Sequence, residues 1–369
     1  MPDTSHVFGV ATQVNNYSYV DRDNLDQKLS RFLRRQTHVA IKGPSKCGKS
    51  WLRQKCMTDA IIIQCRLDME PEDIYRQALS ALHIPFDLQR SSATTIAVNG
   101  SAGGKIKFPI IGESELSGEL HTNYERNCGV ELDFSSSIEN LEFVANSIIQ
   151  SGKRLVVEDF HYLGLSARKK LAHDLKTLWD YKCFVVIIGV WTQANLLTYL
   201  NSDLTGRIEE LSISWTDKDL NQVIENGSAV LNIEIDSNIK NSIVKDSFGN
   251  VGILQSLLLR LVEDEANISE TSRYKHFITN PGWYINAAKS YANQLDGLYQ
   301  QFVQTLSKGI RQRKRSTGIY ALAMQAIVEA DDAQLMNGYS RGDIFNKTNA
   351  IEPRILKGNL KTVLQKIAT

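Results

Sequence analysis

The chain contains the stretch Gly43-Pro44-Ser45-Lys46-Cys47-Gly48-Lys49-Ser50, which has the form G-x-x-x-x-G-K-S of a phosphate-binding loop. A β-branched run at residues 38–42 precedes it, and a helix-competent stretch at residues 51–55 follows. Between a strand and a helix, such a loop points its backbone N–H groups and the helix N-terminus at phosphate oxygens. The sequence therefore predicts a site for a nucleoside triphosphate.

The residue types of this loop suit particular roles at that site. Gly43 and Gly48 allow backbone angles and a close approach that a side chain would prevent. Lys49 is expected to reach the β- and γ-phosphates, and the Ser50 hydroxyl to bind Mg²⁺. The other loop residues are expected to border the nucleotide: Pro44, Ser45, Lys46 and Cys47.

The bulk composition is that of an ordinary soluble protein, with 42% hydrophobic and 22% charged residues in a chain of 369 and a net charge of +1. This length is enough for two or three domains. No apolar run approaches the ~20 residues of a membrane span, so we expect no membrane contact. The cysteines are scattered and form no C-x-x-C pair: Cys47, Cys56, Cys65, Cys128 and Cys183. They predict reduced thiols in the cytoplasm and no zinc site.

A second signal is the run RLVVEDFH at residues 154–161, in which an apolar strand ends in two adjacent carboxylates, Glu158 and Asp159. We expect both acids at the carboxyl edge of a parallel sheet, beside the phosphate-binding loop. One acid can orient Mg²⁺ and its waters while the other accepts a proton from the attacking water. The pair therefore favours hydrolysis of the bound triphosphate.

With these two motifs the chain resembles the AAA+ and STAND ATPases, including their origin-recognition-like relatives. Residues 43–50 correspond to the Walker A motif, and residues 154–161 resemble Walker B in its hhhhDDhH form. The resemblance implies ATP as the nucleotide, Glu158 on the metal side and Asp159 as the residue that activates water. AAA+ proteins usually carry Asp before Glu. The inverted order here implies slow hydrolysis, or an exchange of the two roles.

The same resemblance assigns residues outside the two motifs. Val20 and Arg22 match a φ-V-x-R stretch and would border the base, although they could equally cover a sheet edge. Thr192, after the fourth strand, would be the polar residue called sensor 1, with Gln193 as the alternative. In the helical lid, residues 248–254 resemble a G-N-P-φ-L-L stretch with Val251 in place of proline.

Arg207 stands just before the fifth strand, where AAA+ proteins carry an arginine that reaches the nucleotide of the next subunit. Such an arginine stabilises charge on the γ-phosphoryl group, and it makes hydrolysis depend on a homo-oligomer. The alternative is a surface ion pair with Glu209 or Glu210. For a lid arginine of the sensor 2 type, Arg260 is a weak candidate.

The predicted fold class is α/β, a P-loop NTPase of AAA+ type with a five-stranded parallel sheet and helices on both faces. We expect an ATP-binding core at residues 1–215, an α-helical lid at 216–281 and a helical, winged-helix-like region at 282–369. A β-hairpin insertion is expected at about 90–130, residues 1–18 should be extended, and the second strand, at 60–67, should be buried on both faces. The chain ends without strands for a wing, which predicts a truncation of a longer protein.

From residue 306 to the end, the sequence contains eleven basic and five acidic residues. Such a region could bind DNA phosphates, or it could be a solvated face. Three function classes therefore remain open. The first is an oligomerising ATPase switch, used for example in prokaryotic anti-phage defence, with an effector on a partner or beyond residue 369. The second is a DNA-binding loader or transposition-type ATPase, and the third a nucleotide-binding regulator with little turnover.

Overall fold

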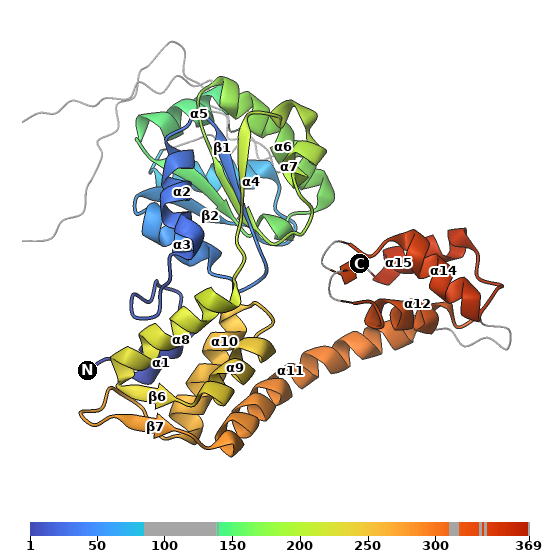
Figure 1. The fold of residues 1–369 in the computed structure, drawn as a ribbon. Helices are drawn as coiled ribbons and strands as arrows, with labels where there is room; N and C mark the ends of the chain where they lie inside the picture. The colour runs from blue at the N-terminus through green and yellow to red at the C-terminus, as the bar shows by residue number, and fades with distance from the viewer. Residues whose placement is uncertain (85–137, 139, 310–316, 332–333, 336–337, 368–369) are drawn as a thin grey trace, which may run out of the picture. The chain divides into compact units, whose positions relative to one another are not determined.

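A computed structural model of the chain describes residues 1–84, 138, 140–309, 317–331, 334–335 and 338–367 (Figure 1). The chain forms two compact units, Met1–Pro281 and Gly282–Thr369. The insertion expected at about 90–130 lies outside the described residues, as does most of the basic run at 308–315.

A five-stranded parallel sheet forms the centre of the first unit, as predicted. Its strands pair in the order β2-β3-β4-β1-β5. The bounds are β1 His38–Lys42, β2 Ala60–Gln64, β3 Arg154–Glu158, β4 Val186–Gly189 and β5 Ile208–Ser212. All five residues of β1 are buried, since alternate side chains enter the apolar layers on opposite faces of the sheet.

Helices cover both faces of this sheet, which confirms the predicted layers. One apolar cluster joins the sheet to α4, α5, α6 and α7, and a second joins the opposite face to α2 and α3. The bounds are α2 Leu25–Leu33, α3 Lys49–Cys56, α4 Pro71–Ala81, α5 Leu141–Gln150, α6 Leu165–Asp180 and α7 Leu196–Leu200. Short 3₁₀ turns complete the layers: η1 Arg22–Asn24, η2 Phe160–Tyr162 and η3 Ser202–Leu204.

The second strand departs from its prediction. β2 ends at Gln64, three residues early, and pairs only with β3 among the described residues. Its central residue Ile62 is 40% exposed, and Leu67 beyond the strand is 74% exposed. The prediction that this strand is buried on both faces is wrong, because β2 lies at the edge of the sheet and one of its faces meets solvent.

The lid of the first unit is built on three helices and a small sheet. Its elements are α8 Asp217–Leu231, α9 Ser237–Asp246, α10 Val251–Leu259, the π-helical η4 Arg260–Glu265, β6 Ile233–Ile235 and β7 His276–Ile278. The Thr216 hydroxyl and the Asp219 carboxylate cap α8 reciprocally. The parallel pair of β6 and β7 was not predicted, because each strand has only three residues.

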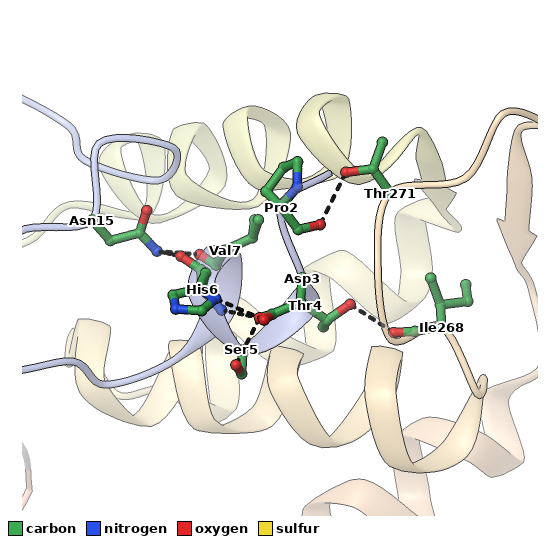
Figure 2. Close-up of polar contacts among 9 residues, drawn as sticks. All are labelled: Pro2, Asp3, Thr4, Ser5, His6, Val7, Asn15, Ile268 and Thr271. Atoms are coloured by element: carbon green, nitrogen blue, oxygen red, sulfur yellow. Dashed lines mark hydrogen bonds and ion pairs between the residues drawn. The ribbon is translucent and has the colours of Figure 1, made fainter.

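Residues 1–18 are not simply extended, so that prediction was wrong. Thr4–Phe8 form helix α1, which packs among the lid helices, and the Asp3 side chain caps it (Figures 1 and 2). The Thr4 hydroxyl donates to the carbonyl oxygen of Ile268 at 2.6 Å, and Thr4 is fully buried. Phe8 is also fully buried, against Gly227, where a Cβ would lie 2.2 Å from its ring.

The second unit is helical. Its described elements are α11 Pro281–Gly309, α12 Ile319–Val328, α14 Arg341–Ile351 and α15 Lys357–Ile367. The last three share an apolar core that includes Ala323, Ala326, Ile344, Ile355, Leu360 and Val363. The helical character of this region agrees with the sequence prediction.

His38 fixes the amino-terminal end of the sheet. It is fully buried, its Nδ1 accepts a hydrogen bond from the Val185 N–H at 2.9 Å, and its Nε2 donates to the Leu175 carbonyl at 2.8 Å. Burial lowers the pKa of His38 to about 4, because the charged imidazolium would lose its hydration there. The folded chain therefore holds this histidine neutral.

The folded pKa of His38 lies below the unfolded value, so its contribution to stability is present above about pH 6.5 and is lost as pH falls toward 4. The loss should reach about 3 kcal/mol at pH 4. We expect the unfolding free energies of wild type and His38→Gln, measured by urea titration, to converge between pH 7 and pH 5. A gap that stays constant with pH would contradict this assignment.

Candidate functional site

The phosphate-binding loop joins the carboxyl end of β1 to α3, which begins at Lys49. Gly48 has φ +88°, in the left-handed region that favours glycine. At Gly43 a Cβ would lie 2.7 Å from the Cys47 Sγ and 3.0 Å from the Ile213 carbonyl oxygen. Both glycines are therefore required by the loop's own geometry, as the sequence motif indicated.

Lys49 turns its side chain back over the loop. It is only 9% exposed, and its Nζ donates to the carbonyl oxygens of Gly43 at 3.0 Å and Pro44 at 2.6 Å. The ammonium group is thus held at the loop that should cradle the phosphates. Ser50, the next residue of α3, is exposed.

Two side chains hold the loop from behind. The Cys47 carbonyl oxygen accepts hydrogen bonds from Arg22 Nη1 and from Trp215 Nε1, both at 3.0 Å. Arg22 is 3% exposed and lies 4.1 Å over the Trp215 ring, and burial lowers its pKa. Arg22 and Val20, which the resemblance places beside the base, both line the cavity described below.

The two acids lie at the carboxyl end of β3, the edge of the sheet that also carries the loop. Glu158 is the last residue of β3 and is buried, and its Oε1 accepts from Arg53 Nε at 3.0 Å. Asp159 follows in the left-handed region, with φ 56°, and is partly exposed. This turn separates the two neighbours: Glu158 faces α3, and Asp159 stays accessible to solvent.

One cavity of about 400 Å³ joins these features. Both acids and His161 line it, together with residues 45–51 of the loop and α3. Its other walls come from segments far away in sequence: Gly9–Thr12, Ser18–Val20, Trp215, and Val251, Gly252 and Gln255 of the lid. The cavity therefore lies between core and lid within the first unit.

The side chains around this cavity suit magnesium bound together with phosphate. Ser50, Glu158 and Asp159 offer only oxygen atoms, which Mg²⁺ prefers. Among the described residues no group of three His, Cys, Asp or Glu side chains could hold a metal unaided. In phosphate sites Mg²⁺ takes one or two carboxylates and completes its shell with phosphate oxygens and water. The donor set fits that arrangement.

Two further predicted residues lie away from the cavity walls. Thr192 is exposed in the segment after β4 and does not line the cavity. The neighbouring Gln193 carbonyl accepts from Lys42 Nζ at 3.2 Å, which ties this segment to the end of β1. Arg260 begins η4 and is also outside the cavity lining.

Arg207 lies beside the amino-terminal ends of the strands, whereas the phosphate-binding loop follows their carboxyl ends. Its carbonyl oxygen accepts from the N–H of His38, the first residue of β1, so the length of that strand, about 16 Å, separates it from the loop. Its guanidinium packs 4.8 Å over the Trp179 ring. The alternative surface pair is not formed, because Glu209 pairs with Arg35 and Glu210 with Lys42.

Sequence analysis did not identify two parts of this site, the N-terminal segment and Arg53. Trp51 Nε1 donates to the Ala11 carbonyl at 2.9 Å and Gln54 Nε2 to the Thr12 carbonyl at 2.7 Å, which holds the N-terminal segment on α3. Arg53 was read as an ordinary residue of that helix. The available signals were the apolar pair Val7-Phe8 in a polar terminus and a basic residue one turn after Lys49.

His161 follows the acids and lies between them and β4. Its Nδ1 accepts from the Val190 N–H at 3.3 Å, and burial lowers its pKa. It matches the last position of the hhhhDDhH form. One nitrogen of its ring therefore bonds to the residue that follows β4, and His161 forms part of the cavity wall.

Solved structures resemble this chain in fold. The Walker-type ATPase PABY2304 of Pyrococcus abyssi matches 98% of this chain and 93% of its own, at 15% identity and a TM-score of 0.56. Two further structures match less closely. RuvB, the Holliday junction branch migration motor of Thermotoga maritima, has 14% identity and a TM-score of 0.43, and the match covers 93% of this chain and 91% of RuvB. Cdc6p of Pyrobaculum aerophilum has 11% identity and a TM-score of 0.41, with 98% of this chain and 89% of Cdc6p covered. No protein-family model and no curated protein matches the sequence.

The chain thus has an α/β fold of the P-loop NTPase type, like that of the Walker-type ATPase, which confirms the predicted fold class. Within the described residues, no helix combines the length and the apolar character needed to cross a membrane.

The hydrogen bond behind the loop should contribute to nucleotide affinity by holding the cradle in shape. We expect Trp215→Phe, which removes the bond to the Cys47 carbonyl, to weaken binding of a fluorescent ATP analogue about fivefold. Trp179→Phe is the matched control, because it removes a similar bond of 2.9 Å, to Gln36, at the far edge of the sheet. Equal affinities for the two variants would show that the bond has no such role.

Proposed function

We propose that the chain is an ATP-binding and ATP-hydrolysing switch that works as a homo-oligomer. The observation that carries this proposal is that one and the same cavity is lined by Lys49 and by the acids Glu158 and Asp159. A phosphate cradle alone suits binding. A cradle with an accessible carboxylate at the same cavity also suits attack by water.

Each residue has a chemical task in this proposal. Lys49 and the loop N–H groups bind the phosphates, and Ser50 and Glu158 hold Mg²⁺, which would supply charge neutralisation at the phosphates. Asp159, partly exposed, accepts the proton of the attacking water. Exchange of the roles of the two acids is disfavoured, because Glu158 is buried against Arg53.

Contacts between lid and loop support a switch. Asn250 Nδ2, at the start of α10, donates to the Ser45 carbonyl at 3.1 Å, and a Cβ on Gly252 would lie 2.5 Å from the Cβ of Lys46. A nucleotide that changes the loop therefore changes what the lid contacts. The bound nucleotide can favour one lid orientation only through a difference in its affinity for the two orientations.

Two variants test the proposed reaction. Lys49→Ala should weaken binding of the fluorescent ATP analogue about tenfold to a hundredfold, since it removes a charge-assisted phosphate contact. Asp159→Asn should keep affinity within about threefold, yet lower phosphate release about a hundredfold or more. Tight binding without turnover, unchanged by Asp159→Asn, would instead support the nucleotide-binding regulator.

The position of Arg207 supports a site shared between subunits. Its distance from the loop of its own chain means that only a second copy could bring it to a γ-phosphate. Its neighbours Glu209 and Glu210 are engaged with other cations, so the guanidinium is not neutralised by them.

Mixing variants tests the shared site. Arg207→Ala keeps an intact nucleotide site, and Lys49→Ala keeps the arginine, so each should be inactive alone and the mixture should recover ATPase activity. Arg35→Ala, an arginine on the same edge, is the matched control and should stay active by itself. No recovery, together with a monomeric size in the presence of a slowly hydrolysed ATP analogue, would contradict the oligomer.

A DNA-binding ATPase of the loader or transposition type is the second candidate. It is favoured by exposed basic residues on two helices of the second unit: Arg341, Lys347, Lys357 and Lys361. Stimulation of ATPase activity by duplex DNA, weakening steeply with salt, would distinguish it from the switch. The winged-helix likeness, an effector partner and the use in defence stay predictions.

A further inference from the structure

We propose that Arg53 allows this site to bind a nucleoside triphosphate without magnesium, by neutralising Glu158. The inference rests on the proposed function, since it concerns the same nucleotide. Its basis is the ion pair of 3.0 Å between Arg53 Nε and Glu158 Oε1, whose side chains are 11% and 5% exposed. Both residues line the cavity beside Lys49.

The position of Arg53 follows from the helix that the loop begins. Arg53 stands four residues after Lys49 on α3, so the two side chains lie on the same face, one turn apart. Glu158 ends β3 and faces that helix. The cation that binds the acid and the cation that binds the phosphates are therefore carried by the same rigid element.

A buried carboxylate is costly unless a cation or hydrogen-bond donor pairs with it. Near a triphosphate the cost is greater, because the carboxylate also repels the phosphate charge. An unpaired anion in a poorly hydrated site repels the phosphate charge more strongly than it would in water. Magnesium usually removes that repulsion. Here Arg53 already neutralises Glu158, so the repulsion is reduced before any metal binds.

Arg53 and a magnesium ion can contact Glu158 at the same time. The contact is made through Nε to one carboxylate oxygen, Oε1. The second oxygen remains for a magnesium ion or for one of its waters. The other charged side chains around the cavity are Asp159, which is partly exposed, and three cations, Arg22, Lys46 and Lys49. Lys49 donates to the carbonyls of Gly43 and Pro44, and Arg22 donates to that of Cys47.

A purely structural pair would behave differently. An ion pair that only ties α3 to β3 would change the free energy of unfolding when one partner is removed, and would leave the effect of magnesium on nucleotide affinity unchanged. The informative quantity is therefore the ratio of the dissociation constant in EDTA to that in excess magnesium.

We would measure this ratio for a fluorescent ATP analogue in wild type, Arg53→Met, Arg53→Lys, Glu158→Gln and the double variant Arg53→Met/Glu158→Gln. Arg53→Met should raise the ratio about tenfold or more, because EDTA then leaves Glu158 unneutralised. Arg53→Lys and the double variant should both return it to within about threefold of wild type. The unfolding midpoint of each variant is followed in parallel.

An unchanged ratio in Arg53→Met, or a double variant that stays as metal-dependent as the single one, overturns the proposal. If Arg53→Met does not fold, Glu158→Gln carries the test: it should bind in EDTA at least as tightly as wild type, and weaker binding would overturn it. Absence of nucleotide binding by wild type in both buffers is a separate result, which contradicts the proposed function itself.

Discussion

The parallel register of β3, β4 and β1 is the constraint on which the rest of the site depends. β4 pairs with both neighbours, Ile187 lying opposite Val157 on one side and Ala40 on the other. The carboxyl ends of β3 and β1 are thereby fixed one strand apart. The loop after β1 and the acids after β3 must then share an edge, whatever the intervening helices do. The amino-terminal edge, with His38 and Arg207, is separated from them by the length of the strands.

The N-terminal segment forms another wall of the cavity at the carboxyl ends of the strands. Phe8 anchors α1 inside the lid, Trp51 holds Ala11 on α3, and Gln255 of the lid donates to the Ser18 hydroxyl at 3.0 Å. Within about ten residues this segment thus leaves the lid core, passes the helix of the phosphate loop and returns to a lid contact. Any change in lid orientation must move or strain these bonds. One side of the cavity is therefore formed by a backbone segment whose position depends on both the core and the lid.

The sequence predicted what is local and missed what is paired over a distance. Residues 43–50 and the two acids could be identified because a loop and a strand end each carry their chemistry in consecutive positions. The partner of Glu158 could not, because Arg53 is more than a hundred residues away and its spacing from Lys49 is ordinary for a solvated helix. The exposed face of β2 was missed for a similar reason: an apolar run does not reveal whether its strand lies at an edge. Asp3 is a residue type that commonly caps helices, but a helix of five residues has too little periodicity to be recognised in the sequence.

The distribution of arginines suggests that binding and hydrolysis are controlled separately. Arg22 holds the back of the loop through the Cys47 carbonyl, and Arg53 neutralises Glu158, so two cations of the chain itself prepare the phosphate end of the cavity. In the proposed function, the arginine that stabilises charge on the γ-phosphoryl group is Arg207, which lies at the far ends of the strands and would come from another copy. A chain arranged in this way would load nucleotide as a single copy and turn it over only after assembly, because the contact that favours the transition state is absent until then.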